Sequence, residues 1–442
     1  MVALDQHPTV LNHRHGRQTE KTRISADELR AMCMSAGADD CGFVAIGDPA
    51  LDDQRDLILA AYPFAKTLIS IVKRMNTENV RSPMRSYSNS EFHATGDEVT
   101  ETGREIVRSL AAHGIRAGNA NMAFPMEADR WPGRMWVVSH KPVAVAAGMG
   151  RMGIHRSVIH PRFGSFILLG TVASEVEIET SSGAIEFNPC LECKLCVAAC
   201  PTGALSPDGH FNFSACYSHN YREFMGGFGE WVETIADARN SRDFRQQVTD
   251  SENVSMWQSL AFGPNYKAAY CVAVCPAGEE VIGPYLDDRA AFVQEFVKPL
   301  QAKEETIYVH KGSDAERHVK RRYPNKRIKH VKKKFALTSI AQFLNGVRLS
   351  FERHRSEGLN AVYHFKFTGA ETAEATITIR DRTLKVDPGL QGKPDLTVTA
   401  DSQTWLRFLR KETGMPWALI RRKVRLKGPP RLLLAFGRCF VA

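Results

Sequence analysis

The feature that most constrains this chain is a run of four cysteines, C-x-x-C-x-x-C-x-x-x-C-P, which ends at Pro201. Three thiolates at intervals of three residues wrap three corners of an iron-sulfur cubane, and a distant fourth cysteine closes it. Zinc sites typically use two C-x-x-C pairs, so a triple followed by Cys-Pro is a poor zinc pattern. The run therefore predicts a 4Fe-4S site that uses Cys190, Cys193 and Cys196.

The remaining ligands follow from the way two-cluster ferredoxins share their cysteines. In those proteins the fourth cysteine of the run, here Cys200, binds the other cluster. We therefore expect Cys275 to complete the first site, and Cys200, Cys216 and Cys271 to hold a second cluster. A full repeat would place a further cysteine at position 268, where the chain has Ala268. The second cluster is accordingly a three-iron form, a four-iron form with a non-cysteine ligand, or absent.

The uneven distribution of the cysteines favours metal ligation over disulfides. Seven of the ten cysteines lie between positions 190 and 275, and such a cluster in a reducing compartment is typical of a metal site. We expect Cys33, Cys41 and Cys439 to be ordinary buried thiols. The N-terminus lacks the apolar run of a signal sequence, and no stretch approaches the roughly 18 apolar residues of a membrane span. These patterns predict a cytoplasmic protein without a membrane span.

The positive charge of the chain is concentrated in one segment. The formal net charge is +9, and residues 317–334 hold ten Lys or Arg and no acid. Such a run is most often a solvated connector. The alternatives are contact with the phosphate backbone of a nucleic acid, which needs few sequence-specific contacts, or docking of an acidic electron donor.

Hydrophobic patterning divides the chain into several parts. A helix-like stretch follows a plausible cap at Ser25, and the apolar run 165–178 reads as a buried strand. After position 335 the pattern changes to a helix over 338–351 and an alternating strand over 361–367, followed by an antiparallel sheet and closing helices. We predict an N-terminal tail (1–24), an α/β core (25–180), a ferredoxin-type module (181–285), a helix and basic linker (286–335) and a separate α+β domain (336–442).

The segment PVAVAAGMGRMGIHRSVIHPRFGSFILLGTV, residues 142–172, together with the cysteine run that follows it, resembles the cobalamin-dependent epoxyqueuosine reductases and the related reductive dehalogenases. In that superfamily a Gly-rich stretch and an FGS-containing strand precede a two-cluster ferredoxin module. The likeness covers roughly residues 25–285. Its matching residues are Ala147, Gly148, Gly150, Gly153, His155, Phe163, Gly164 and Ser165.

This resemblance implies an α/β core with an inserted or appended two-cluster ferredoxin-like module and a base-off cobalamin on the core, whose cobalt the near cluster reduces. Glycines would let the backbone approach a large flat cofactor, because no side chain intervenes. The alternative is that the glycines only form tight turns between a helix and a strand. The cofactor-binding candidates are Gly148, Gly150, Gly153, Phe163, Gly164 and Ser165.

The chain also departs from these families. Epoxyqueuosine reductases carry a proton-donating Asp just before the Gly-rich segment, and the corresponding stretch here, RMWVVSHKP, has none. Asp129, His140 and His155 are the candidate catalytic proton donors, since histidine titrates closest to neutrality. The twin-arginine export signal usual in the dehalogenases is missing, and no DxHxxG cobalamin motif occurs.

The C-terminal residues from about 336 resemble the sterol carrier protein type-two fold, through GKPDLTVTADSQTWLRFLRKETG and VRLKGPPRLLLAF. That resemblance implies an α+β domain with an apolar tunnel for a lipid-like ligand, or a domain that only packs or dimerises. Epoxyqueuosine reductases commonly end instead in helical repeats that help hold transfer RNA.

Three functions follow from these observations. The first is a cytoplasmic iron-sulfur reductase that passes electrons to a cofactor, possibly cobalamin, and reduces an apolar or lipid-like substrate. The second is an epoxyqueuosine-reductase-like enzyme acting on tRNA, which the basic segment and the family likeness favour. The third is a ferredoxin-like electron carrier with a lipid-binding domain and no catalysis. Either enzyme needs an electron donor such as a flavodoxin, a ferredoxin or a reductase.

Overall fold

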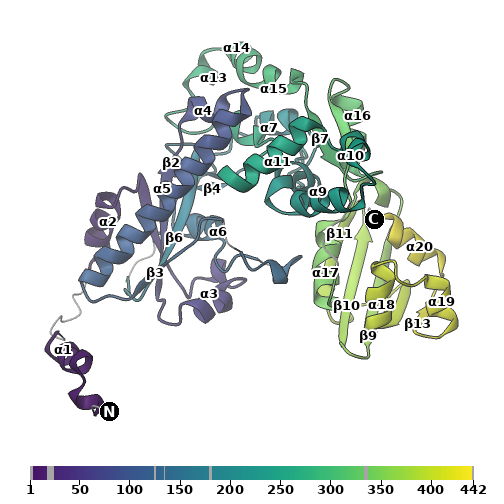
Figure 1. The fold of residues 1–442 in the computed structure, drawn as a ribbon, viewed down its shortest axis with the longest axis horizontal. Coiled ribbons are helices and arrows are strands. Elements are labelled where there is room, and N and C mark those ends of the chain that lie inside the picture. The colour runs from purple at the N-terminus through teal and green to yellow at the C-terminus, as the bar shows by residue number, and fades with distance from the viewer. Residues whose placement is uncertain are drawn as a thin grey trace.

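The computed structural model describes residues 3–16, 24–123, 126–133, 135–178, 182–332 and 337–440. The chain forms an arch of three parts (Figure 1): an α/β part, a mainly helical part that carries the cysteines, and a C-terminal part. A short helix, α1 (Pro8–Gly16), lies apart from the arch. None of the described helices combines the length and the apolar character needed to cross a membrane. The boundaries predicted at 180/181 and 335/336 lie outside the described residues.

A four-stranded antiparallel sheet forms the centre of the N-terminal part. Its strand order is β1-β2-β6-β3, with bounds Asp40–Ala45, Thr67–Arg74, Ile167–Ser174 and Ala117–Ala120. The two central strands, β2 and β6, are almost continuously buried, as expected for apolar runs covered on both faces. The strand predicted within 165–178 is therefore confirmed as β6.

Helices cover both faces of this sheet. On one face α2 (Ala26–Ser35) and the long α5 (Arg85–Ala112) pack against β1, β2 and β6 through a core that includes Leu29 and Ile106. On the other face α3 (Arg55–Ala61) and α6 (His140–Ala146) pack through Ile58 and Val143. Ser25 caps α2 in a capping box with Glu28, as the sequence predicted. The part is thus a three-layer mixed α/β structure.

The cysteine-bearing part consists of short helices that share one core with the end of the α/β part. The core joins cysteine-bearing segments to Met75, Val80 and Phe166. Its helices are α4 (Thr77–Arg81), α7 (Leu195–Ala199), α8 (Phe213–Asn220), α9 (Gly226–Asp237), α10 (Ser241–Gln247), α11 (Asp250–Phe262), α12 (Tyr270–Ala273), α13 (Gly283–Asp287), α14 (Arg289–Phe292) and α15 (Lys298–Ala302).

The described part of the basic segment, residues 317–332, is folded rather than extended as a linker. It lies within a β-α-β unit in which β7 (Thr306–Val309) pairs in parallel with β8 (Arg327–His330) across α16 (Asp314–Arg322). One face of α16 enters the common core through Ala315 and Val319. Several of its cations are paired, for example Lys326 with Glu305 at 2.8 Å. Part of the basic charge is therefore neutralised within the fold.

The C-terminal part is a five-stranded sheet with helices on it. The strand order is β11-β10-β9-β12-β13, with bounds Thr383–Pro388, Ala373–Arg380, Ala361–Thr368, Leu396–Asp401 and Val424–Lys427. The helices are α17 (Ile340–Leu349), α18 (Ser402–Leu409), α19 (Met415–Ile420) and α20 (Arg431–Arg438). The predicted helix at 338–351 and strand at 361–367 are observed. The sheet is not wholly antiparallel as predicted, because the connection 389–395 returns β12 to lie parallel to β9.

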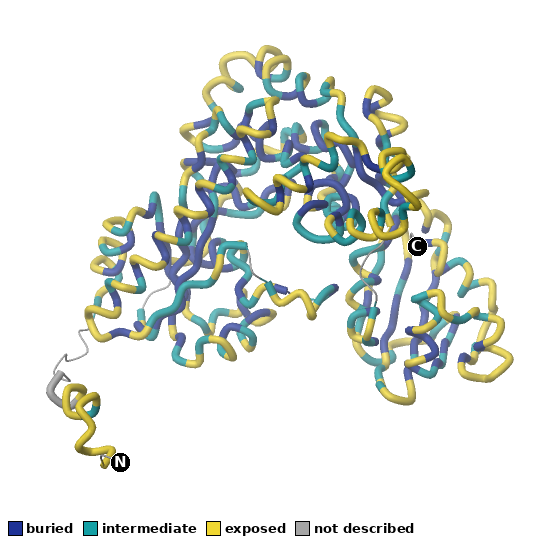
Figure 2. Tube along the Cα trace, viewed as in Figure 1, coloured by how far each residue is buried: buried dark blue, intermediate teal, exposed yellow. Residues whose placement is uncertain are grey.

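This C-terminal sheet has its own hydrophobic core. Phe343, Phe365 and Trp405 meet edge to face within it, with ring centroids 5.5 to 6.0 Å apart, and every member of the cluster lies between positions 337 and 440. Figure 2 shows the buried strands at the centre of this part and exposed backbone along its outer edge. Cys439 is buried here, and Cys33 and Cys41 are buried in the α/β part, which confirms the three predicted buried thiols.

Candidate metal centre

Four of the predicted ligands line one cavity between the α/β part and the cysteine-bearing helices. Cys190 and Cys193 lie in the loop before α7, Cys196 lies on α7, and Cys275 follows α12. The cavity has about 290 Å³ of atom-free space, part of it open to solvent. The other lining residues are Ile154, His155, Ile159, Leu191, Lys194, Pro276 and Ala277.

The loop reaches around this cavity because its backbone turns sharply between the cysteines. Glu192 and Lys194 both adopt left-handed conformations, with φ of 49° and 62°, which non-glycine residues seldom adopt without a structural demand. Asn188 accepts a 3.1 Å hydrogen bond from the Cys190 N–H through its side chain, and so fixes the entry to the loop. Pro276 directly follows Cys275.

Burial raises the pKa of three thiols of the first set, Cys193, Cys196 and Cys275. Burial raises the pKa of Cys196, and the nearby Cys271 and Cys275 raise it further. Burial also raises the pKa of Cys275 to about 11. Thiolates are the form that binds metal, and a bound metal supplies the charge that stabilises them. Four clustered thiols, three of them desolvated, therefore match a metal site better than a set of reactive free cysteines.

Four cysteines line the cavity, which is the number of thiolates that one iron-sulfur cubane takes. Within the part of the chain that the structure describes, no three His, Cys, Asp or Glu side chains are close enough to hold one metal ion. A zinc site brings its ligands to within about 2.3 Å of one atom, whereas an iron-sulfur cluster fills the space between its thiolates. Four thiols around an atom-free cavity thus suit the cubane that the spacing predicted.

The second predicted set lies beside the first. Cys216 is on α8, Cys271 is on α12, and the Cys200 sulfur lies 3.7 Å from the Thr202 hydroxyl. Burial raises the pKa of Cys271 to about 12, with Cys200 as the next cause. Burial likewise raises the pKa of Cys216, followed by the effects of Cys271 and Cys200. Cys200 belongs to one hydrophobic cluster, and Cys216 and Cys271 pack against that same cluster.

His155 is the one proposed proton donor that the structure brings to the cysteines. Its ring is buried and lines the cavity of the first set. The Nδ1 atom accepts a 3.1 Å hydrogen bond from the Ser157 N–H, so Nε2 carries the proton, and no described residue accepts it. Burial lowers the pKa of His155 to about 4, and Lys141 lowers it further. His155 is therefore a neutral donor beside the cavity.

His140 and Asp129 occupy different surroundings. His140 opens α6, and both of its ring nitrogens are engaged, with the Thr171 hydroxyl at 2.8 Å and the Asn121 carbonyl at 2.9 Å. Its hydrogen bonds tie α6 to β6 and leave no ring nitrogen free for proton transfer. Asp129 is exposed, and its carbonyl accepts a 3.3 Å hydrogen bond from Gln342 of the C-terminal part. Neither side chain lines the cavity of the first set.

The glycines of the Gly-rich segment pack against the chain's own backbone. A Cβ atom at Gly148 would lie 2.5 Å from the Gly183 carbonyl oxygen, and one at Gly150 would collide with the Ile159 carbonyl. At Gly153 it would lie 2.6 Å from the Ile159 side chain. Gly148 and Gly150 also have positive φ values of 78° and 146°. Glycine is required at these positions for turns and close internal packing.

The FGS segment anchors the loop that carries Cys275. A Cβ atom at Gly164 would overlap the Ala277 carbonyl, and the Ser165 hydroxyl bonds the Val272 carbonyl at 3.5 Å and lowers the pKa of Cys275. Phe163 is buried, and its ring stacks on His160 with centroids 4.8 Å apart. The segment thus holds the fourth thiol of the first set in place.

Three cations beside the cysteines were not anticipated from the sequence. Arg81 and Arg85 are buried next to Cys275 and Cys271 respectively. Lys141 is exposed by its surface area, yet desolvation by its surroundings lowers its pKa, and Cys271 is the first of the groups that oppose this shift. Such charges offset the negative charge of thiolate-bound clusters. Arg81 and Arg85 flank Ser82 and Pro83, the break between α4 and α5, which is the only sequence signal that sets them apart.

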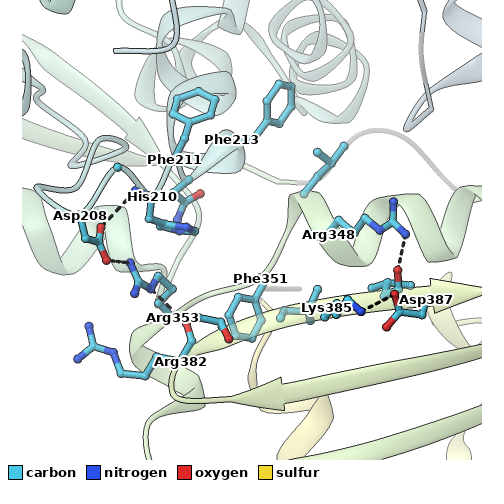
Figure 3. A pocket seen from close by; sticks show the side chains of 16 residues that line it. Asp208, His210, Phe211, Phe213, Arg348, Phe351, Arg353, Arg382, Lys385 and Asp387 are labelled. Carbon is cyan, nitrogen blue, oxygen red and sulfur yellow. Dashed lines mark hydrogen bonds and ion pairs between the residues drawn. The ribbon is translucent and has the colours of Figure 1, made fainter. Parts of the chain in front are cut away.

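A larger cavity lies where the C-terminal part meets the cysteine-bearing part (Figure 3). Its atom-free space is about 1390 Å³, open to solvent. Phe211 and Phe213 project from one side, while Arg348 of α17 and Lys385 of β11 project from the other. Arg353 bridges the two sides through a 2.8 Å ion pair with Asp208. The C-terminal part is therefore docked on the segment that leads into α8, the helix of Cys216.

Comparison with known proteins supports the two resemblances. Residues 344–441 match the SCP-2 sterol transfer family. An epoxyqueuosine reductase from Listeria monocytogenes is 35% identical over 82 residues, which cover 19% of this chain and 21% of that protein. One from Lactococcus garvieae is 29% identical over 160 residues, which cover 35% and 43% respectively. The chain thus spans less than half the length of either relative.

Solved structures show a weaker relation. A reductive dehalogenase whose structure suggests a mechanism for B12-dependent dehalogenation aligns with a TM-score of 0.40 and 13% identity, over 64% of this chain and 40% of that one. The predicted fusion of an epoxyqueuosine-reductase-like segment to a sterol-carrier-like domain is confirmed by the sequence relatives and the family match.

Proposed function

We propose that this chain is an iron-sulfur oxidoreductase that moves electrons through two adjacent clusters. The observation that carries the proposal is the placement of Cys190, Cys193, Cys196 and Cys275 around one cavity. The exchange of Cys200 and Cys275 between the two sets is the arrangement of a two-cluster ferredoxin. Cys196 and Cys200 belong to one hydrophobic cluster against which Cys216 and Cys271 pack, so the two sets adjoin each other.

The positions of the two cysteine sets favour one direction of electron transfer. The first set faces the α/β part, because His155 and Ile159 line its cavity. The second set lies toward α8, which begins at the junction with the C-terminal part. Electrons from an external donor, such as a flavodoxin, a ferredoxin or a reductase, would enter at the second set and leave from the first toward the α/β part.

The fit of a corrinoid is poorer than the fit of the clusters. The space beside Gly148, Gly150 and Gly153 is filled by the chain's own atoms, so these glycines do not form an open cradle for a flat cofactor. Phe163 is likewise enclosed by its neighbours. Cobalamin would supply a strongly reducing metal to a reductase of this kind, but no step of the present proposal passes through it.

Among specific activities, the sequence relatives support reduction of epoxyqueuosine in tRNA. The test uses protein reconstituted with iron and sulfide, a chemical reductant and tRNA that contains epoxyqueuosine. Mass spectrometry of the digested nucleosides should show consumption of epoxyqueuosine, with and without added cobalamin. Cys193→Ala should abolish turnover, whereas Cys33→Ala, which removes a buried thiol far from the cysteine run, should retain it. Binding of the tRNA should also weaken steeply with salt.

A second candidate is reduction of a lipid-like substrate, favoured by the docking of the sterol-carrier-like domain beside the second set. Arg353 pairs with Asp208, and the Asp314 N–H donates a 2.8 Å hydrogen bond to Glu352. Turnover of added unsaturated lipids by the reduced protein, in the absence of activity on tRNA, would select this function. Absence of turnover with either substrate would leave a ferredoxin-like carrier.

A further inference from the structure

We infer that the outer face of the C-terminal domain docks onto an anionic lipid bilayer. The face consists of α19, β13 and the exposed side of α20, and we call it the α19 face. α19 and β13 lie at the outer edge of the domain, away from the cysteine-bearing part (Figure 1), and most residues there are exposed (Figure 2). This inference is independent of the proposed redox function.

The first argument is charge. Residues 402–442 contain a single acid, Glu412, and ten Lys or Arg. Glu412 forms ion pairs with Arg410 at 2.7 Å and with Arg407 at 3.6 Å. Within the described chain, no acidic side chain forms an ion pair with four exposed cations of this face: Arg421, Arg422, Arg425 and Lys427.

The second argument is the apolar surface set among these cations. The side chain of Ile420 is 80% exposed, and that of Leu434 is 71% exposed. Trp417, which is 46% exposed, lies under the Arg421 guanidinium at 5.7 Å. Ala418, between them on α19, is buried and attaches the helix to the core. Tryptophan and aliphatic side chains interspersed with Lys and Arg are typical of segments that lie in a membrane interface.

The combination of exposed cations with exposed apolar side chains favours a bilayer over a nucleic acid as the partner. Lys and Arg would serve either partner, since both present phosphates. A tryptophan can stack on a base, but Ile420 and Leu434 gain free energy only where apolar surface covers them. A bilayer provides both an anionic headgroup layer and hydrocarbon beneath it. The face would therefore lie on the membrane surface rather than span it, and would bring a lipid-carrier-like domain to its ligand.

The test is cosedimentation of the full-length protein with two kinds of vesicle, phosphatidylcholine alone and phosphatidylcholine mixed with phosphatidylglycerol. We expect binding to the mixed vesicles that falls with added salt, and little binding to the neutral ones. Each Lys or Arg near the surface contributes about 1 kcal/mol, or about fivefold in affinity. The Arg421→Ala/Arg422→Ala double variant should lose about 25-fold, and Ile420→Asp at least tenfold.

Matched controls change equivalent residues elsewhere on the surface. Leu260→Asp alters a side chain on α11 that is 59% exposed, and Arg242→Ala/Arg245→Ala removes two cations on α10; both should bind like the wild type. Absence of binding to mixed vesicles at low salt would overturn the inference. So would wild-type binding by Ile420→Asp together with competition by tRNA, because that pair of results would identify a nucleic-acid site.

Discussion

The Arg85 guanidinium donates a 2.7 Å hydrogen bond to the carbonyl oxygen of Ala268, 183 residues further along the chain. Ala268 stands where a complete ligand repeat would place the fourth cysteine of the second set. Its N–H is also held, by a 2.9 Å hydrogen bond to the Asn220 side chain. The backbone at position 268 is therefore fixed by other contacts, and a thiol is what this position lacks relative to the predicted repeat.

Ala268→Cys should restore a complete second site. Because the backbone at position 268 is already fixed, the new thiol would lie three residues before Cys271, in a C-x-x-C spacing, and could close a four-iron cluster. The iron content of reconstituted protein should rise from about seven to about eight per chain, and the electron paramagnetic resonance signal of a three-iron cluster should disappear. Ala273→Cys adds a thiol on α12, two residues beyond Cys271, as a control and should leave both readings unchanged. An unchanged signal in Ala268→Cys would contradict the assignment of this site.

His155→Leu should lower the reduction potential of the first cluster. The Nε2–H of His155 has no described acceptor and lies beside the first set, so a bound cluster would accept it and be easier to reduce. A hydrogen bond of about 1.4 kcal/mol corresponds to about 60 mV for one electron. A spectroscopic redox titration measures the shift. His140→Gln is the control, because the His140 ring is hydrogen-bonded to Thr171 and Asn121. This variant should lower the stability of the protein and leave the reduction potential unchanged. Equal shifts of the potential in both variants would argue against the assignment.

Gly164→Ala should destabilise the first site more than backbone strain alone explains. Gly164 has a φ of 64°, and an added methyl would overlap the Ala277 carbonyl. Gly209→Ala is the matched control, because its φ is 80° but nothing lies within 4 Å of the added methyl. The control should cost about 1 kcal/mol of stability, and Gly164→Ala about 2 to 4 kcal/mol with loss of iron. Thermal unfolding and iron analysis measure these effects. Equal losses of stability and iron in the two variants would contradict the prediction.

Asp401 should stabilise the C-terminal domain in a pH-dependent way. Its carboxylate caps α18 by accepting hydrogen bonds from the Thr404 hydroxyl at 2.6 Å and the Thr404 N–H at 3.0 Å, and these bonds lower its pKa below 3.8. The folded state favours the charged form, so this contribution is present above pH 3.8 and is lost as the pH falls through the lowered pKa. Asp401→Ala should cost about 1 kcal/mol at neutral pH.

Calorimetry of the full-length protein checks this cap. Asp401→Asn keeps a capping side chain but cannot ionise, so at pH 7 it should be less stable than the wild type by the contribution of the charge, and more stable than Asp401→Ala. The difference between wild type and Asp401→Asn should shrink as the pH is lowered. A constant difference between them would show that the charge of Asp401 does not contribute.

Cysteine spacing predicted much of the candidate site because cluster ligation is constrained by local geometry. The run from Cys190 to Cys200 and the exchange with Cys275 could be read directly. The cations beside the cysteines could not be predicted, because Arg85 reaches the second set only through the packing of α5 against a segment 183 residues away. Sequence also cannot show whether a glycine faces a ligand or the chain's own backbone, and at Gly148 and Gly150 it is the backbone.

The folding of the basic segment could have been anticipated in part. Ala315, Val319 and Tyr323 recur at intervals of four residues, which is the core-facing pattern of a helix, and all three are buried. The charge around them obscured that pattern. In the C-terminal domain, alternation located strand β9 correctly, but the parallel pairing of β9 with β12 depends on how a connection crosses the sheet, which local patterning does not encode.

The most direct test of the central claim is the iron, acid-labile sulfide and cobalt content of protein reconstituted anaerobically with iron, sulfide and cobalamin. The two cysteine sets predict about seven or eight irons per chain with matching sulfide, falling to about three or four in Cys193→Ala. Cobalt near one per chain would add a corrinoid to the redox path, and its absence would leave the clusters alone. Fewer than about three irons in the wild type, or tightly bound zinc in place of iron and sulfide, would contradict the assignment of these cysteines.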